Sequence, residues 1–238
     1  MTTTCIVLCA GDNVRWNNHT GVRKHLVEIE GEVLLARTLK QVEAYRPDRT
    51  LVVVREEDAP LYEPYCQGKE IYRLNFESPT TEAWKYLSSQ KIWNTQGRTV
   101  SLLGDVWFSE EAMKQIFTYS EKDWRVFGRS GPSRVNGCPW GEIFAHSFED
   151  PTEHQSNLLK LDQLYRNEIL CASPAGWAHY LLMEGNDIKS RQKALDLLGS
   201  KNNGRVQVGP RFKEIDDFTD DFDYPDDLTR WNSMRQKN

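Results

Sequence analysis

The sequence predicts an α/β fold with a mostly parallel central sheet and a small mixed-sheet extension. Segments of strand-type and helix-type periodicity alternate along most of the 238 residues, as they do in a parallel sheet covered by helices. Residues 4–9 (TCIVLC) form a short apolar run that ends at Ala10-Gly11, which is typical of a buried central strand. In residues 124–148, two strand-like pieces flank a loop of Gly, Pro, Ser and Asn, so this stretch predicts a hairpin.

The remaining elements follow in order from their own patterns. Apolar residues at helical spacing predict helices over 33–45, over 110–117, through most of 156–198, and from Pro225 onward. A further helix is predicted to run to about Trp93, with Ser78, Thr80 or Thr81 as its cap. Short β-branched or apolar runs predict further strands over 50–54, 70–75, 98–103 and 205–208. Since no interdomain linker or internal repeat interrupts the pattern, residues 1–238 are expected to form one domain.

Composition excludes several classes of function. The net charge of −5 and the pI near 5.6 provide no general attraction to nucleic acid, which is therefore not indicated as a partner but is not excluded as an acceptor. The apolar run from Cys5 to Ala10 is far shorter than the roughly 20 residues that span a bilayer, and no basic, signal-peptide-like segment opens the chain. Five cysteines without a CxxC pair indicate reduced thiols, so a cytoplasmic protein without membrane association is expected. Composition does not predict the oligomeric state.

An anion-binding loop is the first candidate site. The loop Ala10-Gly11-Asp12-Asn13 leaves the predicted central strand, where several backbone N–H groups can point at one anion. Arg15 and Lys24 follow, and their positive charges suit the oxygens of a triphosphate. The alternative is an ordinary strand-to-helix turn that carries two surface cations.

Asp105 is the second candidate. It follows Gly104 at the carboxyl end of the strand predicted over 98–103, and open α/β sheets bind ligands at that end. A carboxylate in this position suits magnesium, a hard cation that prefers oxygen ligands and keeps several waters. The alternative is a loop aspartate or a helix cap.

An acidic segment near the end of the chain is the third candidate. Residues 214–227 contain eight acids and no Arg or Lys, and this density of negative charge requires water or a cation. Asp226 and Asp227 suit the positive end of the helix that begins near Pro225. Asp223 lies just outside that helix and is therefore the metal-ligand candidate, with a solvated loop acid or cap as the alternative.

Together the three segments resemble the nucleotidyltransferase superfamily with a glycosyltransferase-A-like fold, of the molybdenum-cofactor guanylyltransferase-like or sugar-phosphate nucleotidyltransferase type. The family opening reads approximately AGxGxR…PKxLxxxxGxPLL, and here it reads AGDNVRWNNHTGVRKHLVEIEGEVLL. The mid-chain acid after a strand is Gly104-Asp105, and the closing D-x-P-E-D-L element is DYPDDL at 223–228. The resemblance implies a Rossmann-like α/β/α sandwich.

The resemblance also implies the ligands. The loop from Ala10 to Asn13 would hold a nucleoside triphosphate together with Arg15 and Lys24. Asp105 and Asp223 would share Mg²⁺, with Mn²⁺ as an alternative. The residues that would help to hold the base are Ser78, Thr80 and Thr81. Two positions depart from the family pattern: Asn13 replaces the second loop glycine, and Arg23 replaces the proline before the lysine and adds charge near the phosphates. Either change is compatible with a different donor, such as a nucleotide sugar.

The hairpin at 124–148 is expected to cover the acceptor side of such a site. Trp140 would stack on a sugar ring, and Arg129 and Glu142 would bind polar groups of the acceptor. Ordinary packing is the alternative for Trp140. The residues left without a role, because they lack metal-ligand spacing, are His146, His154 and His179.

The leading hypothesis is transfer of a nucleoside monophosphate from a triphosphate to a phosphorylated small-molecule acceptor, with release of pyrophosphate. The first alternative is a glycosyltransferase of the same fold type that uses a nucleotide-sugar donor. The second alternative is a non-catalytic nucleotide-binding protein. The identity of the donor separates the two enzymes, whereas the third protein would bind nucleotide without turning it over.

Overall fold

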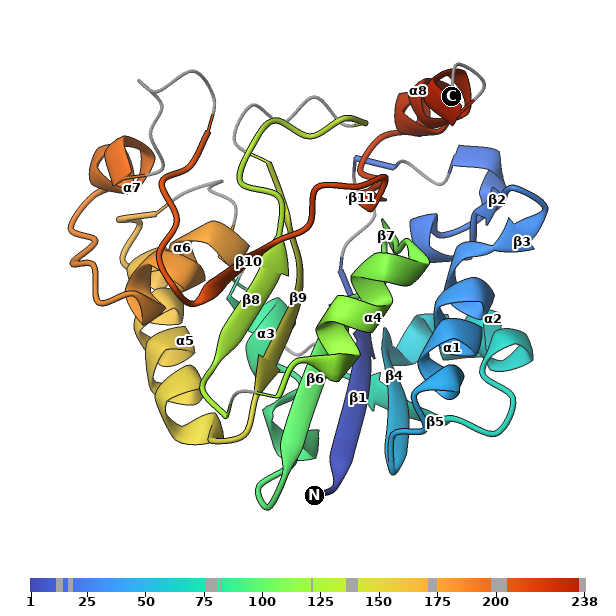
Figure 1. Ribbon diagram of the computed structural model, residues 1–238, viewed down its shortest axis with the longest axis horizontal. Coiled ribbons are helices and arrows are strands. Elements are labelled where there is room, and N and C mark those ends of the chain that lie inside the picture. The colour runs from blue at the N-terminus through green and yellow to red at the C-terminus, as the bar shows by residue number, and fades with distance from the viewer. Residues whose placement is uncertain are drawn as a thin grey trace.

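The computed structural model describes residues 1–11, 15–16, 19–75, 81, 83–120, 122–135, 141–170, 175–197 and 205–235. Its centre is a seven-stranded sheet (Figure 1). From one edge to the other, the strands are β10 (Phe212–Glu214), β8 (Arg125–Gly128), β9 (Ile143–Phe148), β6 (Arg98–Leu103), β1 (Thr3–Leu8), β4 (Arg49–Arg55) and β5 (Glu70–Leu74). Of these strands, β9 alone runs antiparallel to its neighbours β6 and β8. The predicted α/β class with a mostly parallel sheet is confirmed, and the predicted hairpin, β8 and β9, forms the mixed part of this same sheet.

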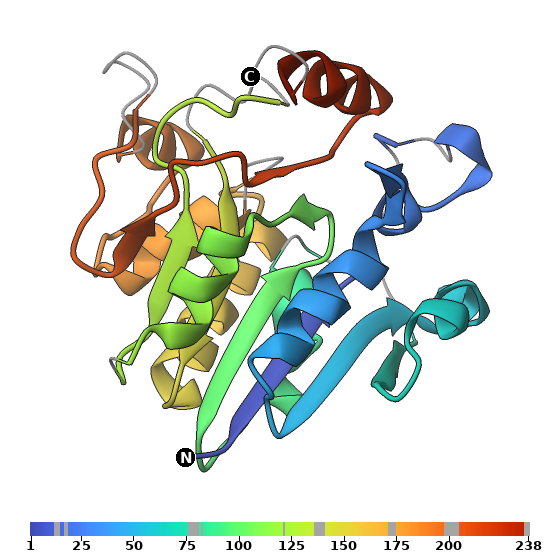
Figure 2. The same ribbon diagram turned by 45° about the vertical axis from the view of Figure 1, so that its right-hand side comes forward.

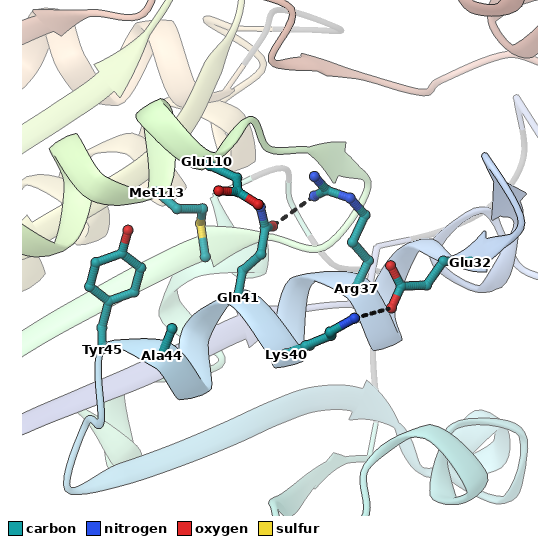
Figure 3. A pocket seen from close by; sticks show the side chains of 8 residues that line it. All are labelled: Glu32, Arg37, Lys40, Gln41, Ala44, Tyr45, Glu110 and Met113. Atoms are coloured by element: carbon teal, nitrogen blue, oxygen red, sulfur yellow. Dashed lines mark hydrogen bonds and ion pairs between the residues drawn. The ribbon is translucent and has the colours of Figure 1, made fainter.

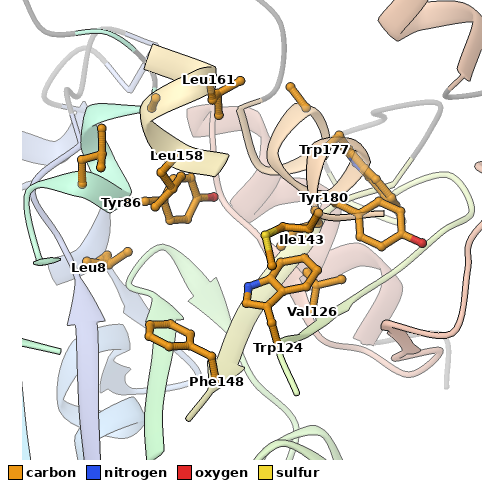
Figure 4. Close-up of a cluster of buried hydrophobic side chains, with 14 of the residues drawn as sticks. Leu8, Tyr86, Trp124, Val126, Ile143, Phe148, Leu158, Leu161, Trp177 and Tyr180 are labelled. Carbon is orange, nitrogen blue, oxygen red and sulfur yellow. The ribbon is translucent and has the colours of Figure 1, made fainter. Parts of the chain in front are cut away.

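Helices cover both faces of the sheet, because successive side chains of a strand point to opposite sides. In β1, Ile6 and Leu8 belong to the hydrophobic core on one face, whereas Cys5 and Val7 belong to the core on the other. The first core, whose aromatic cluster is shown in Figure 4, lies under α3 (Trp84–Leu87), α5 (Pro151–Arg166), α6 (Ala175–Met183) and α7 (Arg191–Leu197). The second core lies under α1 (Leu34–Ala44), α2 (Ala59–Tyr62) and α4 (Glu110–Thr118).

A third core joins the N-terminal loop to the C-terminal segment. Its short elements are β2 (Glu28–Ile29), β3 (Glu32–Val33), β7 (Val106–Trp107), β11 (Asp220–Asp221) and α8 (Pro225–Arg235). Trp16, Trp107 and Trp231 are buried together here, and β7 pairs antiparallel with β11. In both views α8 lies at the end of the sheet opposite the N-terminus (Figures 1 and 2), which is the end where the parallel strands finish. This packing brings the acidic segment over the carboxyl ends of the central strands.

Two predicted elements differ from the structure. The helix expected to run to about Trp93 is reduced to the short α3 and a 3₁₀ turn at Gln90–Ile92. Thr81 does not cap it, because the Thr81 hydroxyl donates to the Asp162 carboxylate, while Ser78 and Thr80 lie outside the described residues. The run at 205–208 is not a strand, because the backbone bond from Val206 N to Ser130 O (2.8 Å) is not continued into a ladder, and β10 pairs with β8 instead.

Three histidines from different elements meet in the first core. His146 of β9, His154 of α5 and His179 of α6 are each at most 2% exposed, and their ring centroids lie 4.8–5.9 Å apart. Within the described part of the chain, neither ring nitrogen of His146 has a hydrogen-bond partner. Burial lowers the pKa of His146 to about 3 and holds the pKa values of the other two well below their ordinary range. The three rings are therefore neutral in the folded protein.

This cluster predicts a loss of stability in mild acid. An unfolded histidine binds a proton below its ordinary pKa of about 6.5, whereas folded His146 does so only near pH 3. Protonation therefore favours the unfolded state between these two pH values. The full stability is present above pH ~6.5 and declines as the pH falls toward 3. At pH 5 the protonation of unfolded His146 is expected to lower the free energy of unfolding by about 2 kcal/mol. Urea denaturation between neutral and mildly acidic pH measures this slope. His146→Leu should make it shallower and exposed His19→Leu should not; equal slopes in wild type and His146→Leu would contradict the prediction.

Candidate active site

Four residues predicted from three separate motifs converge at the carboxyl ends of the central strands. The Lys24 ammonium lies between two carboxylates: it forms an ion pair with Asp105, and its Nζ lies 3.1 Å from Oδ1 of Asp223. The other oxygen of Asp223, Oδ2, lies 2.5 Å from Nη1 of Arg15. The side chain of Lys24 is only 8% exposed and that of Asp223 only 10%, whereas that of Arg15 is 53% exposed. The site therefore has a buried ion-pair centre with one cation at its open side.

Local backbone structure explains why these groups meet. Gly104 donates its N–H to the Leu8 carbonyl at 2.9 Å, which holds the end of β6 beside the end of β1 and places Asp105 there. A Cβ atom at Gly104 would lie 2.8 Å from the Leu8 carbonyl oxygen, so a glycine is required for this approach. Lys24 begins the 3₁₀ turn Lys24–Leu26, and Phe222 N donates to the Asp105 carbonyl at 3.0 Å. That last bond sets Asp223 next to Asp105.

The charges of Lys24 and Asp105 support each other. Burial acts to lower the pKa of Lys24, but the nearby carboxylates of Asp105 and Asp223 outweigh it and the pKa is raised. Burial acts to raise the pKa of Asp105, but Lys24 outweighs it and the pKa falls to about 2. Both groups are therefore ionised at neutral pH, because the charge of each compensates for the burial of the other.

Asp221 is a site residue that the sequence analysis missed. It is 7% exposed, and its pKa is raised well above the ordinary value by burial and then by Glu142, Asp223, Asp220 and Asp105. A signal existed in the sequence: residues two apart in an extended segment share a face, so Asp221 belongs with Asp223. Neighbouring Asp220 has its carboxylate engaged elsewhere, by Arg129.

The donor set fits a hard divalent cation. No group of three or more His, Cys, Asp or Glu side chains within the described part of the chain is arranged to hold a metal ion by itself. Magnesium, however, is ordinarily bound through one or two carboxylates, with waters and substrate phosphates completing its coordination. Asp105 and Asp223 supply two such carboxylates, and their charges, after burial and Glu142, contribute to the raised pKa of Asp221. A divalent cation brought in with a polyphosphate would relieve this repulsion.

Solved structures of other proteins share the fold of this chain. No protein-family model and no curated protein sequence matches the chain. Its structure is similar to that of a 4-diphosphocytidyl-2C-methyl-D-erythritol synthase from Anaerococcus prevotii, at 14% identity and a TM-score of 0.60, over 99% of this chain and 96% of that one. A CTP:phosphocholine cytidylyltransferase from Streptococcus pneumoniae is similar at 13% identity and a TM-score of 0.52, over 99% and 100% of the two chains. A nucleotidyl transferase from Methanothermobacter is similar at 15% identity and a TM-score of 0.54, over 100% and 99%. The chain has a nucleotidyltransferase-type fold.

Within the nucleotidyltransferase-type fold, the other predicted residues have different positions. Ala10 and Gly11 follow β1, and the Ala10 carbonyl accepts a bond of 3.2 Å from Arg55 Nε. Glu142 is half-buried and lies near enough to Asp221 to act on its charge. The predicted residues that lie outside the described part of the chain are Asp12, Asn13, Ser78, Thr80 and Trp140. Thr81 is described, but its hydroxyl is engaged with Asp162.

Two predicted cations are engaged inside the protein. Arg129, expected on the acceptor side, is 3% exposed, and its Nη1 lies 2.6 Å from Oδ2 of Asp220. Its second nitrogen, Nη2, donates to the carbonyls of Asp217 (2.7 Å) and Thr219 (2.9 Å). Arg129 therefore holds the C-terminal segment in place. Arg23, expected to add charge near the phosphates, forms an ion pair of 2.6 Å with buried Asp58. Neither guanidinium is directed at Asp105 or Asp223 by these contacts.

A separate hollow of about 380 Å³ lies between α1 and α4 (Figure 3). Within it Lys40 pairs with Glu32, and Arg37 donates to Gln41 and to the Phe108 carbonyl. None of the residues predicted for the nucleotide site lines this hollow. In the described part of the chain, no helix is both long and apolar enough to cross a membrane.

Proposed function

We propose that this protein is a metal-dependent nucleotidyltransferase that moves a nucleoside monophosphate from a nucleoside triphosphate to a phosphorylated small-molecule acceptor, a sugar or alcohol phosphate. One observation carries the proposal: Lys24, Arg15, Asp105 and Asp223 meet at the carboxyl end of the central strands. This is the end at which open α/β sheets bind ligands. Solved structures with the same fold include a CTP:phosphocholine cytidylyltransferase and a nucleotidyl transferase.

The residues present suit phosphoryl chemistry, in which positioning and charge neutralisation account for most of the catalysis. An oxygen of the acceptor phosphate attacks the α-phosphorus of the triphosphate, and the bond from that phosphorus to the bridging oxygen of the pyrophosphate breaks. Lys24 and Arg15 neutralise the negative charge that accumulates on the leaving pyrophosphate. Because the acceptor phosphate is already ionised, the reaction requires no general base from the protein.

Asp105 and Asp223 would hold the divalent cation, Mg²⁺ or Mn²⁺, which when bound supplies electrostatic stabilisation of the α-phosphate oxygens. Glu142, whose charge acts on the neighbouring Asp221, adds to the negative potential that attracts the cation. The role of this chain's own residues is thus to place two anionic reactants side by side and to balance their charge.

The identity of the released product tests the proposal. We expect pyrophosphate release from one of the four ribonucleoside triphosphates with Mg²⁺ and a panel of sugar and alcohol phosphates, and little release without an acceptor. Coupled pyrophosphatase and phosphate detection measures it. Release of a nucleoside diphosphate from a nucleotide sugar would instead establish glycosyl transfer. Binding of nucleotide without either product would establish a non-catalytic binding protein.

A further inference from the structure

Lys24 occupies the space between the two carboxylates assigned to the metal. Its ammonium forms an ion pair with Asp105 and lies 3.1 Å from Asp223 Oδ1. One positive charge is thus shared by two carboxylates, and Arg15 supplies the second cation at the remaining oxygen of Asp223, 2.5 Å away. In this arrangement Lys24 and Arg15 are paired with the carboxylate oxygens that a divalent cation would need as ligands.

A metal ion that binds alone must displace this cation. Lys24 is 7% exposed, so an ammonium moved away from both carboxylates without a new partner would be a buried, unpaired charge. Magnesium also gives up its own water reluctantly. Metal binding in the absence of nucleotide is therefore opposed by the cost of separating Lys24 from Asp105 and Asp223.

A triphosphate changes this balance. Its oxygens offer Lys24 and Arg15 a second set of anionic partners, with charge-assisted hydrogen bonds of the same kind as those made to Asp223. Once the two cations turn to the phosphates, Asp105 and Asp223 are left as carboxylates close to Asp221 and Glu142. A divalent cation is then the group that restores neutrality.

We propose that Lys24 is the group that couples nucleotide binding to metal binding: it competes with the metal for Asp105 and Asp223 until a triphosphate engages it. Arg15 assists at Asp223. The coupling is reciprocal, so each ligand strengthens the binding of the other by the same factor. This inference rests on the proposed function, because it takes the triphosphate to be the ligand of Lys24.

Manganese binding without any nucleotide provides the test. Titration calorimetry with MnCl₂ on the full chain compares wild type with Lys24→Met, which removes the charge and keeps the length of the side chain. We expect Lys24→Met to bind Mn²⁺ about tenfold more tightly than wild type, within the ~5- to 150-fold range of typical couplings. Lys40→Met, at an exposed lysine paired with Glu32, is the matched control and should bind Mn²⁺ like wild type. An unchanged or weaker affinity in Lys24→Met would overturn the inference.

A second measurement adds a non-hydrolysable analogue of the triphosphate. It should tighten Mn²⁺ binding in wild type and do so much less in Lys24→Met, because the competing cation is already absent. If Lys24→Met fails to fold, Arg15→Met at the exposed side of the site serves instead, with a smaller gain in Mn²⁺ affinity expected because one of the two competitors remains. No gain with that variant would overturn the inference.

The outcomes also separate this inference from the proposed function. Tighter Mn²⁺ binding by Lys24→Met in a protein that transfers no nucleotide would support the competition and contradict nucleotidyl transfer. Nucleotidyl transfer by wild type together with unchanged Mn²⁺ affinity in Lys24→Met would support the function and contradict the competition.

Discussion

Replacing Asp105 by Asn should lower the turnover number for pyrophosphate release by about 10²- to 10³-fold, the size of effect found when one preorganised electrostatic contact is removed from a phosphoryl or acyl transfer site. Asp105 is the carboxylate whose pKa falls to about 2, so it is fully ionised under assay conditions. The amide keeps the shape of the side chain and removes its charge, which leaves Asp223 as the remaining assigned carboxylate. Raising the Mg²⁺ concentration should recover part of the loss, since a metal that has lost a charged ligand binds more weakly. Steady-state kinetics over a range of Mg²⁺ concentrations measures both effects.

The matched control for this change is Asp216→Asn in the same acidic segment. Asp216 is exposed and pairs with surface Arg134 at 2.7 Å, so its replacement removes one negative charge without touching the site. We expect turnover close to that of wild type for the control. If Asp105→Asn retains turnover within a few fold of wild type, the assignment of the metal to Asp105 is wrong.

Replacing Arg129 by Leu should cost about 3–5 kcal/mol of unfolding free energy, because it leaves a buried carboxylate without its cation. The side chains of Arg129 and Asp220 are 4% and 1% exposed, and Nη1 and Oδ2 lie 2.6 Å apart. The same guanidinium also holds the carbonyls of Asp217 and Thr219. Urea denaturation measures the loss. Nucleotide binding should weaken as well, because the segment that Arg129 holds leads directly into Asp221 and Asp223.

Surface and rescue variants make this prediction specific. Arg134→Leu breaks an exposed ion pair with Asp216 and should cost about 1 kcal/mol or less. Combining Arg129→Leu with Asp220→Asn should recover part of the stability, since the second change removes the stranded charge. Equal losses of unfolding free energy in Arg129→Leu and Arg134→Leu would show that the buried pair of Arg129 and Asp220 stabilises the protein no more than an exposed pair does.

The acidic segment illustrates how far charge patterns can be interpreted from sequence. Its excess of carboxylates indicated that a cation must be near, and the structure provides several: Arg129 for Asp220, Lys24 and Arg15 for Asp223, and Arg230 for Asp227. The predicted structural role of Asp227 is confirmed, because its Oδ2 accepts the backbone N–H groups of residues 223 (2.8 Å) and 224 (2.7 Å). Which cations pair with Asp220 and Asp223 was not predictable, since Arg129, Lys24 and Arg15 lie far from them along the chain, whereas Arg230 lies one helical turn from Asp227.

Local sequence patterns were sufficient to predict those helices and strands that are defined by the apolar spacing of their own residues. The apolar run of β1 and the helical spacing of α1 each reflect the environment of their own residues, and these two elements and α4 agree with prediction. The long helix expected to reach about Trp93 does not agree: the described residues there form only the short α3 and a 3₁₀ turn, and the Thr81 hydroxyl donates to Asp162 of α5 and does not cap a helix. A contact formed across the fold there outweighs a local capping preference.

The sequence by itself determined the α/β class, the order of the main strands and helices, and the four residues at the centre of the candidate site. Each of these follows from the periodicity of a short segment, from a motif at the end of a strand or, for Asp223, from an acidic segment just before a predicted helix. Only the tertiary structure decided that Lys24 lies between Asp105 and Asp223, that Asp221 joins them, and that Arg129 is turned inward to Asp220. The physical reason is that a charged side chain takes the partner that compensates its burial, and that partner is set by the packing of distant segments.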